Sequence, residues 1–161
     1  MFDPVRICEI LNEEGVEYIV IGGFAAVIHG SSLPTREIDV LPTRESGNLT
    51  KLARALNRIG AMIRTSGDPV STGIDGPFLA NTLLMLDLVT DLGEMNLSFS
   101  PSGPFDGYDG WNAQAVVVTI APGINVRVAS LDDIIASKQA SDRPKDHRVL
   151  PYLESLRDQL Q

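Results

Sequence analysis

The sequence has a single cysteine and no long apolar run. That residue, Cys8, excludes an intramolecular disulfide and a cysteine-based zinc site. No apolar run reaches the length that would cross a membrane, so we expect no membrane partner. Residues 1–15 contain acidic side chains and no cleavable apolar segment, which argues against a signal peptide. These features together predict a protein of the reducing cytoplasm.

Basic residues are also scarce, with 13 Lys and Arg against 21 Asp and Glu and a net charge of −8. This balance argues against a broad nucleic-acid-binding surface. The charge is uneven, because residues 36–64 hold six basic and three acidic side chains. An anionic ligand could be drawn to this region. The simpler interpretation of Lys51, Arg54 and Arg58 is one solvent-exposed helix face.

The chain has 161 residues, of which 43% are hydrophobic, enough for the core of one domain. Apolar spacing predicts helices over residues 4–14, 24–29, 49–59, 131–140 and 145–160. Short apolar runs predict strands over residues 17–21, 38–41, 61–64, 82–89, 95–99, 115–120 and 124–128. We therefore expect residues 1–161 to form a single α+β domain, a mixed sheet with helices mainly on one face.

Polar and cyclic residues mark the ends of these elements. Asp3 before Pro4, Asn48 and Ser130 are typical N-cap residues. Pro151 is expected to interrupt or kink the last helix. Residues 65–77 and 101–110 are rich in glycine, proline, serine and aspartate and are predicted to be loops.

Two glycines, Gly22 and Gly23, separate the first strand from the next helix. Glycines at such a turn allow the backbone to approach a ligand closely. The free N–H groups at the start of the helix attract phosphate. Many strand–helix turns carry glycine for steric reasons, so the pair by itself is a weak signal.

Two carboxylates, Glu37 and Asp39, follow on the second predicted strand. Their alternation places both on one face, while Ile38 and Val40 point to the core. Two carboxylates on one face suit a hard divalent cation such as Mg²⁺, which binds oxygen ligands and nucleotide phosphates together. Taken alone, a Glu-x-Asp pattern is more simply a pair of exposed residues at a sheet edge.

The combined pattern resembles a known signature. The signature is that of the DNA-polymerase-beta-like nucleotidyltransferase superfamily, and the residues that resemble it are Ile21-Gly22-Gly23 followed, after thirteen residues, by Glu37-Ile38-Asp39-Val40. Residues 126–138 (VRVASLDDIIASK) and 143–146 (RPKD) resemble segments of its minimal bacterial branch, which includes the AbiEii and MenT-type toxins. The resemblance implies the nucleotidyltransferase fold for most of the chain.

The resemblance also implies a nucleotide site. An NTP would bind with its phosphates at Gly22 and Gly23, and Ser31 or Thr35 would add hydroxyl contacts. Lys138 would reach a phosphate from a later helix, and the resemblance also implies a catalytic role for it. An exposed helical lysine is an equally weighted interpretation of Lys138.

The catalytic and metal-binding residues implied by the resemblance are Glu37 and Asp39, which would hold Mg²⁺ or Mn²⁺, with Asn96 at the third catalytic position. The implied reaction moves an NMP from the NTP to a hydroxyl of a tRNA, a protein or a small molecule. The implied biological role is the toxin of a toxin–antitoxin pair, with an antitoxin-like protein as partner.

Three residues depart from the family pattern. Glu37 stands where the family usually has aspartate, and Asn96 replaces the expected third carboxylate. Asparagine removes a charge and cannot act as a general base. Val149 stands where the family often has another aspartate. The alternative is therefore a catalytically degenerate binding or interaction module with the same fold.

Nearby side chains offer a replacement for the missing charge. Glu94 lies two residues before Asn96 on the same strand face, and Asp91 lies in the adjoining turn. His29 is a further candidate, although a lone histidine near a helix end is more often a structural hydrogen-bonding residue.

Overall fold

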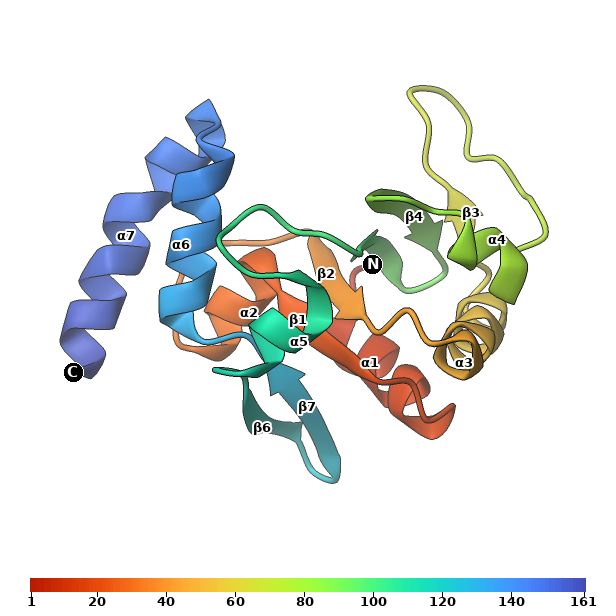
Figure 1. The fold of residues 1–161 in the computed structure, drawn as a ribbon, viewed down its shortest axis with the longest axis horizontal. Helices are drawn as coiled ribbons and strands as arrows, with labels where there is room; N and C mark the ends of the chain where they lie inside the picture. The colour runs from red at the N-terminus through yellow and green to blue at the C-terminus, as the bar shows by residue number, and fades with distance from the viewer.

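A computed structural model describes residues 1–161 as a seven-stranded mixed sheet with seven helices (Figure 1). The expected α+β class is therefore confirmed. The strands are β1 (Tyr18–Ile21), β2 (Glu37–Pro42), β3 (Met62–Ile63), β4 (Met85–Thr90), β5 (Gly93–Ser98), β6 (Val116–Ala121) and β7 (Ile124–Val128). The helices are α1 (Pro4–Glu13), α2 (Gly22–Ile28), α3 (Ser46–Arg58), α4 (Gly76–Ala80), α5 (Gly107–Asn112), α6 (Leu131–Ser141) and α7 (Pro144–Leu160).

The strand order β3-β4-β5-β2-β1-β7-β6 places the N-terminal strands at the centre of the sheet. Strand β2 pairs antiparallel with β1 and parallel with β5. In this register Asp39 lies opposite Ile21 on one side and Asn96 on the other. The end of β1 and the polar residues of β2 and β5 are thereby brought together.

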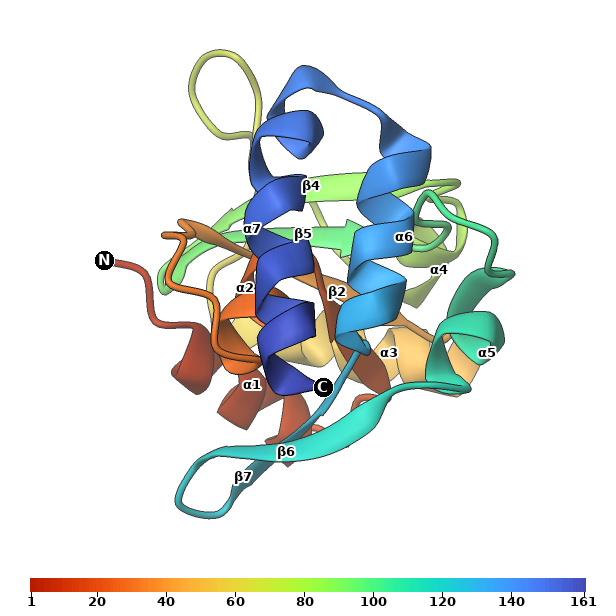
Figure 2. The same ribbon diagram turned by 90° about the vertical axis from the view of Figure 1, so that its left-hand side faces the viewer.

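The two faces of β2 meet different surroundings. Ile38 and Val40 are fully buried in the hydrophobic core, as their alternation predicts. Helices α1 and α3 contribute Ile7, Leu52 and Leu56 to the same core. Figure 2 shows α6 and α7 standing beside each other in front of β2, β4 and β5. The polar side chains of β2 thus face a space enclosed by sheet and helices.

Two predicted N-caps are confirmed and one is wrong. The side chain of Asp3 accepts a hydrogen bond from the Arg6 N–H at 3.0 Å, and that of Ser130 accepts from the Asp133 N–H at 3.1 Å. Helix α3 instead begins after Glu45, so Asn48 lies within its first turn.

Asn48 serves a tertiary contact in place of the predicted cap. Its buried amide accepts from the Glu17 N–H at 2.7 Å and donates to the carbonyls of Glu17 and Thr43 at 3.0 and 3.1 Å. These bonds fix α3 against the ends of β1 and β2. The buried Asn48 amide is tolerated because both its donor and its acceptor are paired.

Three other local predictions need correction. Two short helices, α4 and α5, begin at the ends of the predicted loops and continue beyond them. The Asp75 side chain caps α4 by accepting a 2.8 Å hydrogen bond from the Phe78 N–H. Helices of five and six residues leave too little apolar periodicity to detect. Helix α7 continues through Pro151, so the predicted interruption is wrong, while the alternative of a kink there stays a prediction. The exposed position of Pro151 allows water to replace the lost backbone donor.

No helix in residues 1–161 combines the length and the apolar character that a membrane span requires.

Candidate active site

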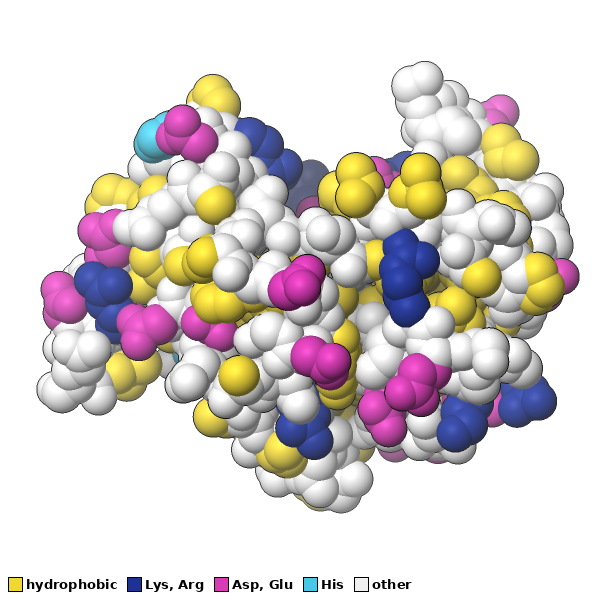
Figure 3. All heavy atoms as spheres, in the orientation of Figure 1, with side chains coloured by type: hydrophobic (Ala, Val, Ile, Leu, Met, Phe, Trp, Pro, Cys, Tyr) yellow, Lys and Arg dark blue, Asp and Glu magenta, His cyan; other side chains and the backbone are white.

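A cavity of about 410 Å³ lies between the polar face of the sheet and the α6–α7 pair. In the space-filling view of Figure 3, the surface is hollowed between α6 and β4, with basic side chains on the α6 side. Five of the residues singled out from the sequence line this cavity: Gly22, Glu37, Asp39, Asn96 and Lys138. They come from four separate elements, which the sheet register and the α6 position bring together.

Gly22 and Asp39 lie in direct contact across β1 and β2. Gly22 has a φ of +69°, and a Cβ atom there would lie 2.3 Å from Asp39 Oδ2. Only glycine tolerates both this backbone conformation and this approach. Gly22 is therefore required for a steric reason that involves the site itself, because the residue that leaves no room for a side chain is Asp39, the candidate metal ligand.

Asp39 is mostly enclosed, and burial raises the pKa of its carboxyl above the ordinary value of 3.8. The Asn96 Nδ2 donates to Asp39 Oδ1 at 2.9 Å, which lowers the pKa, and the negative charge of Glu37 raises it again. Lys138 and Lys145 lower it through their positive charges. The carboxylate is thus held in a confined site that favours a cation beside it.

Arg64, which directly follows β3, lies among the polar residues of this sheet face. Its Nη1 is 2.9 Å from Glu94 Oε2 and 3.4 Å from Glu37 Oε2. Its Nη2 is 3.4 Å from Asp87 Oδ2 and donates to Asn96 Oδ1 at 3.3 Å. Sequence reasoning placed Arg64 in a basic region and did not predict this role, because its partners lie on three separate strands.

The α6–α7 junction is built around a buried carboxylate, Asp146. Its side chain is fully buried, with Arg143 Nε 3.0 Å and Lys138 Nζ 3.6 Å from its oxygens. Burial raises the pKa of Asp146, but hydrogen bonds from Arg143 and Ser141 and the charge of Lys138 outweigh it, so the pKa falls from 3.8 to about 2. Lys138 is therefore oriented at the cavity wall by a permanent negative charge behind it.

The remaining predicted nucleotide contacts lie outside the cavity lining. Thr35 Oγ1 donates to the Glu37 carbonyl at 3.0 Å, and a Cβ atom on Gly23 would lie 3.2 Å from Thr35 Oγ1. Ser31 Oγ accepts from the Leu33 N–H at 3.2 Å. These three residues shape the connection between α2 and β2, which positions Glu37 and Asp39.

The candidate replacements for the missing charge separate in the structure. Glu94 lies opposite Glu37 in the β2–β5 register and binds Arg64. Asp91 lies against Gly60 at the end of α3, away from the cavity. The His29 ring nitrogen lies 2.7 Å from the Ala129 carbonyl, a structural hydrogen bond between α2 and the segment before α6.

The residues present suit one divalent cation at most. No group of three or more His, Cys, Asp or Glu side chains in residues 1–161 is arranged to hold a metal ion. Glu37 and Asp39 provide carboxylates on one face of β2, and Mg²⁺ in nucleotide sites is often held by one or two carboxylates together with phosphates. Asn96 uses its amide for Asp39 and Arg64.

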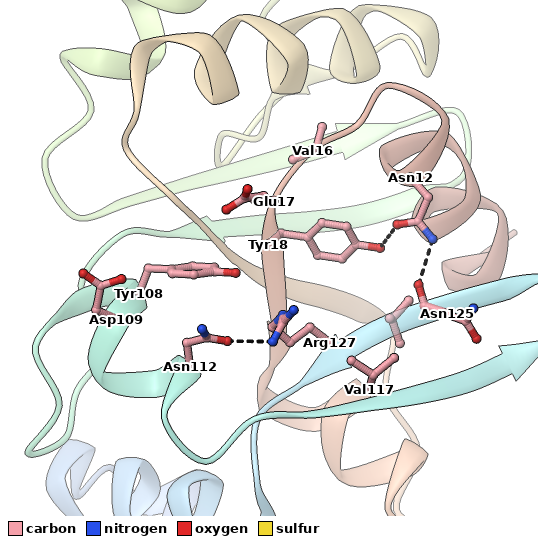
Figure 4. A pocket seen from close by; sticks show the side chains of 11 residues that line it. Asn12, Val16, Glu17, Tyr18, Tyr108, Asp109, Asn112, Val117, Asn125 and Arg127 are labelled. Carbon is pink, nitrogen blue, oxygen red and sulfur yellow. Dashed lines mark hydrogen bonds between the residues drawn. The ribbon is translucent and has the colours of Figure 1, made fainter.

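A second cavity of about 490 Å³ lies beside the start of β1 and is lined by α1, α5 and β7 (Figure 4). Two pairs of its polar side chains hydrogen-bond to each other. Tyr18 donates to Asn12 Oδ1 at 2.9 Å, and Arg127 Nη1 donates to Asn112 Oδ1 at 3.1 Å. None of the predicted catalytic, nucleotide-binding or metal-binding residues lines it.

No protein-family model and no curated protein sequence match this chain. The comparison with solved structures identifies the fold as that of nucleotidyltransferases. The lincosamide antibiotic adenylyltransferase LnuA, solved with lincomycin bound, matches with a TM-score of 0.61 and 16% identity over 94% of each chain. TM1012 of Thermotoga maritima, assigned as a nucleotidyltransferase, matches with a TM-score of 0.50 and 19% identity over 99% of this chain and 95% of its own.

Proposed function

We propose that this chain transfers a nucleoside monophosphate from an NTP to a hydroxyl acceptor. The observation that carries the proposal is the meeting of Gly22, Asp39 and Lys138 at one cavity of a nucleotidyltransferase fold. The glycine and the aspartate are in contact, and the lysine faces them from α6. This arrangement supports binding of a triphosphate between the sheet and the α6–α7 pair.

The triphosphate is held by positive charge from one side and backbone from the other. Lys138 and Lys145 line the cavity and supply two ammonium groups for the phosphate oxygens. The Gly22 backbone lies at the cavity wall with no side chain to obstruct it. Glu37 and Asp39 would hold a Mg²⁺ or Mn²⁺ ion, which would supply charge neutralisation and lower the pKa of a bound hydroxyl.

In the reaction, the acceptor hydroxyl oxygen forms a bond to the α-phosphorus of the NTP. The bond from that phosphorus to the bridging oxygen of the β-phosphate breaks, and pyrophosphate leaves. Asn96 has no basic group for the hydroxyl proton. Glu37 and Asp39 are assigned to the cation, and Glu37 also pairs with Arg64, so we assign the proton to solvent water in the open cavity. The lysines offset the charge that gathers on the leaving group.

The acceptor is best matched by a compound with an apolar surface. Leu84 and Met85 line the cavity although 62% and 58% of their surface is exposed. Trp111 also lines it, and its buried indole N–H has no acceptor within the chain. The net charge of −8 makes a tRNA acceptor less favourable than a small molecule or a protein hydroxyl. LnuA was solved with lincomycin bound, a small molecule.

The proposal also includes the AbiEii and MenT-type branch and a toxin role with an antitoxin-like partner. Its support is the sequence resemblance of residues 126–138 and 143–146. The Arg143–Asp146 pair within the second segment holds the α6–α7 junction together. A non-catalytic nucleotide-binding module is the alternative function, and the neutral Asn96 beside Asp39 favours it.

The test uses purified protein with each α-labelled NTP, Mg²⁺ or Mn²⁺, and acceptor mixtures of tRNA, cell-extract protein and small-molecule hydroxyl compounds. We expect label on one acceptor class and none with the Asp39→Ala variant. An Asp158→Ala variant serves as the control, because Asp158 is exposed and far along α7. Binding of NTP without any transfer would favour the non-catalytic alternative.

A further inference from the structure

The guanidinium of Arg64 is surrounded by acceptors from three neighbouring strands. Glu37 on β2, Asp87 on β4 and Glu94 on β5 each place a carboxylate oxygen within 3.4 Å of it, and Asn96 adds an amide oxygen at 3.3 Å. The Arg64 side chain is 31% exposed, so water screens these contacts only in part. The guanidinium therefore offsets the mutual repulsion of three carboxylates that lie close together.

The amide of Asn96 fits between Asp39 and Arg64 because it has both a donor and an acceptor. Its Nδ2 donates to Asp39 and its Oδ1 accepts from Arg64. An aspartate at this position could accept from Arg64 but could not donate to Asp39 in its ionised form. It would also place a like charge beside a buried carboxylate. Asn96 and Arg64 are therefore a matched pair.

We propose that the Arg64 guanidinium is a built-in cation of the site, so that the site takes one divalent ion where a third carboxylate at position 96 would allow two. The proposal rests on the proposed nucleotide site, since Glu37 and Asp39 would hold the single ion together with the nucleotide phosphates. It gives Arg64 and Asn96 a joint role: Arg64 supplies the charge on the β4–β5 side, and Asn96 keeps that charge apart from Asp39.

The number of bound ions tests this proposal directly. Mn²⁺ binding is counted by equilibrium dialysis with a non-hydrolysable ATP analogue, and spin–spin coupling between two Mn²⁺ ions is read from the EPR spectrum. We expect one Mn²⁺ per native chain and no coupling. The Arg64→Gln/Asn96→Asp variant has the third carboxylate and lacks the guanidinium, and we expect it to bind two coupled ions.

Matched variants separate charge from general disturbance. Arg54→Gln removes an exposed arginine of α3 that makes no ion pair, and it should bind one ion like the native chain. Arg64→Lys keeps the charge and should also bind one. Circular dichroism confirms that each variant is folded. If the double variant does not fold, the single Arg64→Gln variant decides the proposal: it keeps Asn96, and a second Mn²⁺ ion should replace the lost guanidinium charge, whereas a single ion would overturn the proposal.

Two coupled ions in the native chain would overturn the proposal, as would a single ion in the folded double variant. Failure of the proposed function gives a different result. If the native chain binds the ATP analogue and one Mn²⁺ but transfers no label to any acceptor, the transferase function fails and the built-in cation stands. If it binds neither the analogue nor Mn²⁺, both proposals are overturned.

Discussion

At the scale of single residues, the site depends on close packing around Asp39. Gly22 leaves no room for a side chain on one side, and the Asn96 amide occupies the other. Buried carboxylates of this kind cost stability in their charged form, which is a common feature of functional sites. Two substitutions test this arrangement.

Replacing Gly22 with alanine should destabilise the protein by at least about 1–2 kcal/mol. The alanine would have to keep the left-handed backbone conformation at φ +69°, and its Cβ would lie 2.3 Å from Asp39 Oδ2. The free energy of unfolding in urea measures the effect. Gly47→Ala is the control, because a Cβ there meets nothing within 4 Å and lies in a helix, where alanine is favoured. Equal stability of the two variants would contradict the proposed contact.

Replacing Asp39 with asparagine should raise the melting temperature at neutral pH while abolishing transfer. The folded-state pKa of Asp39 is raised above 3.8, so its contribution to stability is present below that pH and is lost as the pH rises. The gain from Asp39→Asn should therefore be larger at neutral pH than in acid. Thermal melts of both proteins across this range measure the difference. A gain that does not change with pH would mean that burial of the charge is not its cause.

At the scale of elements, the α6–α7 junction is the part of the site whose stability depends most on charge. The fully buried Asp146 joins Arg143 at the start of α7 to Lys138 on α6. Helix α7 begins with this pairing, because Asp146 also accepts from the Arg143 backbone N–H at 3.1 Å. The position of Lys138 at the cavity thus depends on a contact made behind it.

Replacing Asp146 with asparagine should cost roughly 2–3 kcal/mol at neutral pH. The folded-state pKa is lowered to about 2, so the stabilisation is present above the ordinary value of 3.8 and is lost as the pH falls toward 2. Urea unfolding at neutral and acidic pH should show a cost that disappears in acid. Asp158→Asn, on an exposed side chain of the same helix, should change little at either pH. A cost that persists in strong acid would argue against a charge effect.

At the scale of the whole molecule, the charge is strongly acidic although the proposed ligand is an anion. The net charge of −8 repels polyanions, and only the local lysines at the cavity offset it. We therefore expect no stable tRNA complex at physiological salt, measured by gel mobility shift. A complex that weakens steeply as salt rises would instead reveal a phosphate-binding surface. In that case tRNA would become the preferred acceptor.

The sequence by itself determined the local features of this protein. Alternation along β2 placed Glu37 and Asp39 on one face, and the nearby glycine pair predicted the turn that meets them, since both patterns depend on neighbouring residues. The mixed sheet also followed from short-range apolar patterns. Short helices such as α5, and the tertiary role of Asn48, were not predictable because local propensity there is weak and distant contacts decide the structure.

Only the tertiary structure decided the charge arrangement of the site. Arg64 meets Glu37, Asp87 and Glu94 because β3, β4, β5 and β2 lie side by side in one register, which no local pattern specifies. Likewise Lys138 is oriented by Asp146 because two helices pack together. Asn96 was visible in the sequence as a missing carboxylate. The physical reason for an asparagine at this position is that its amide donates to Asp39 and accepts from Arg64, and only the folded strands bring those groups together.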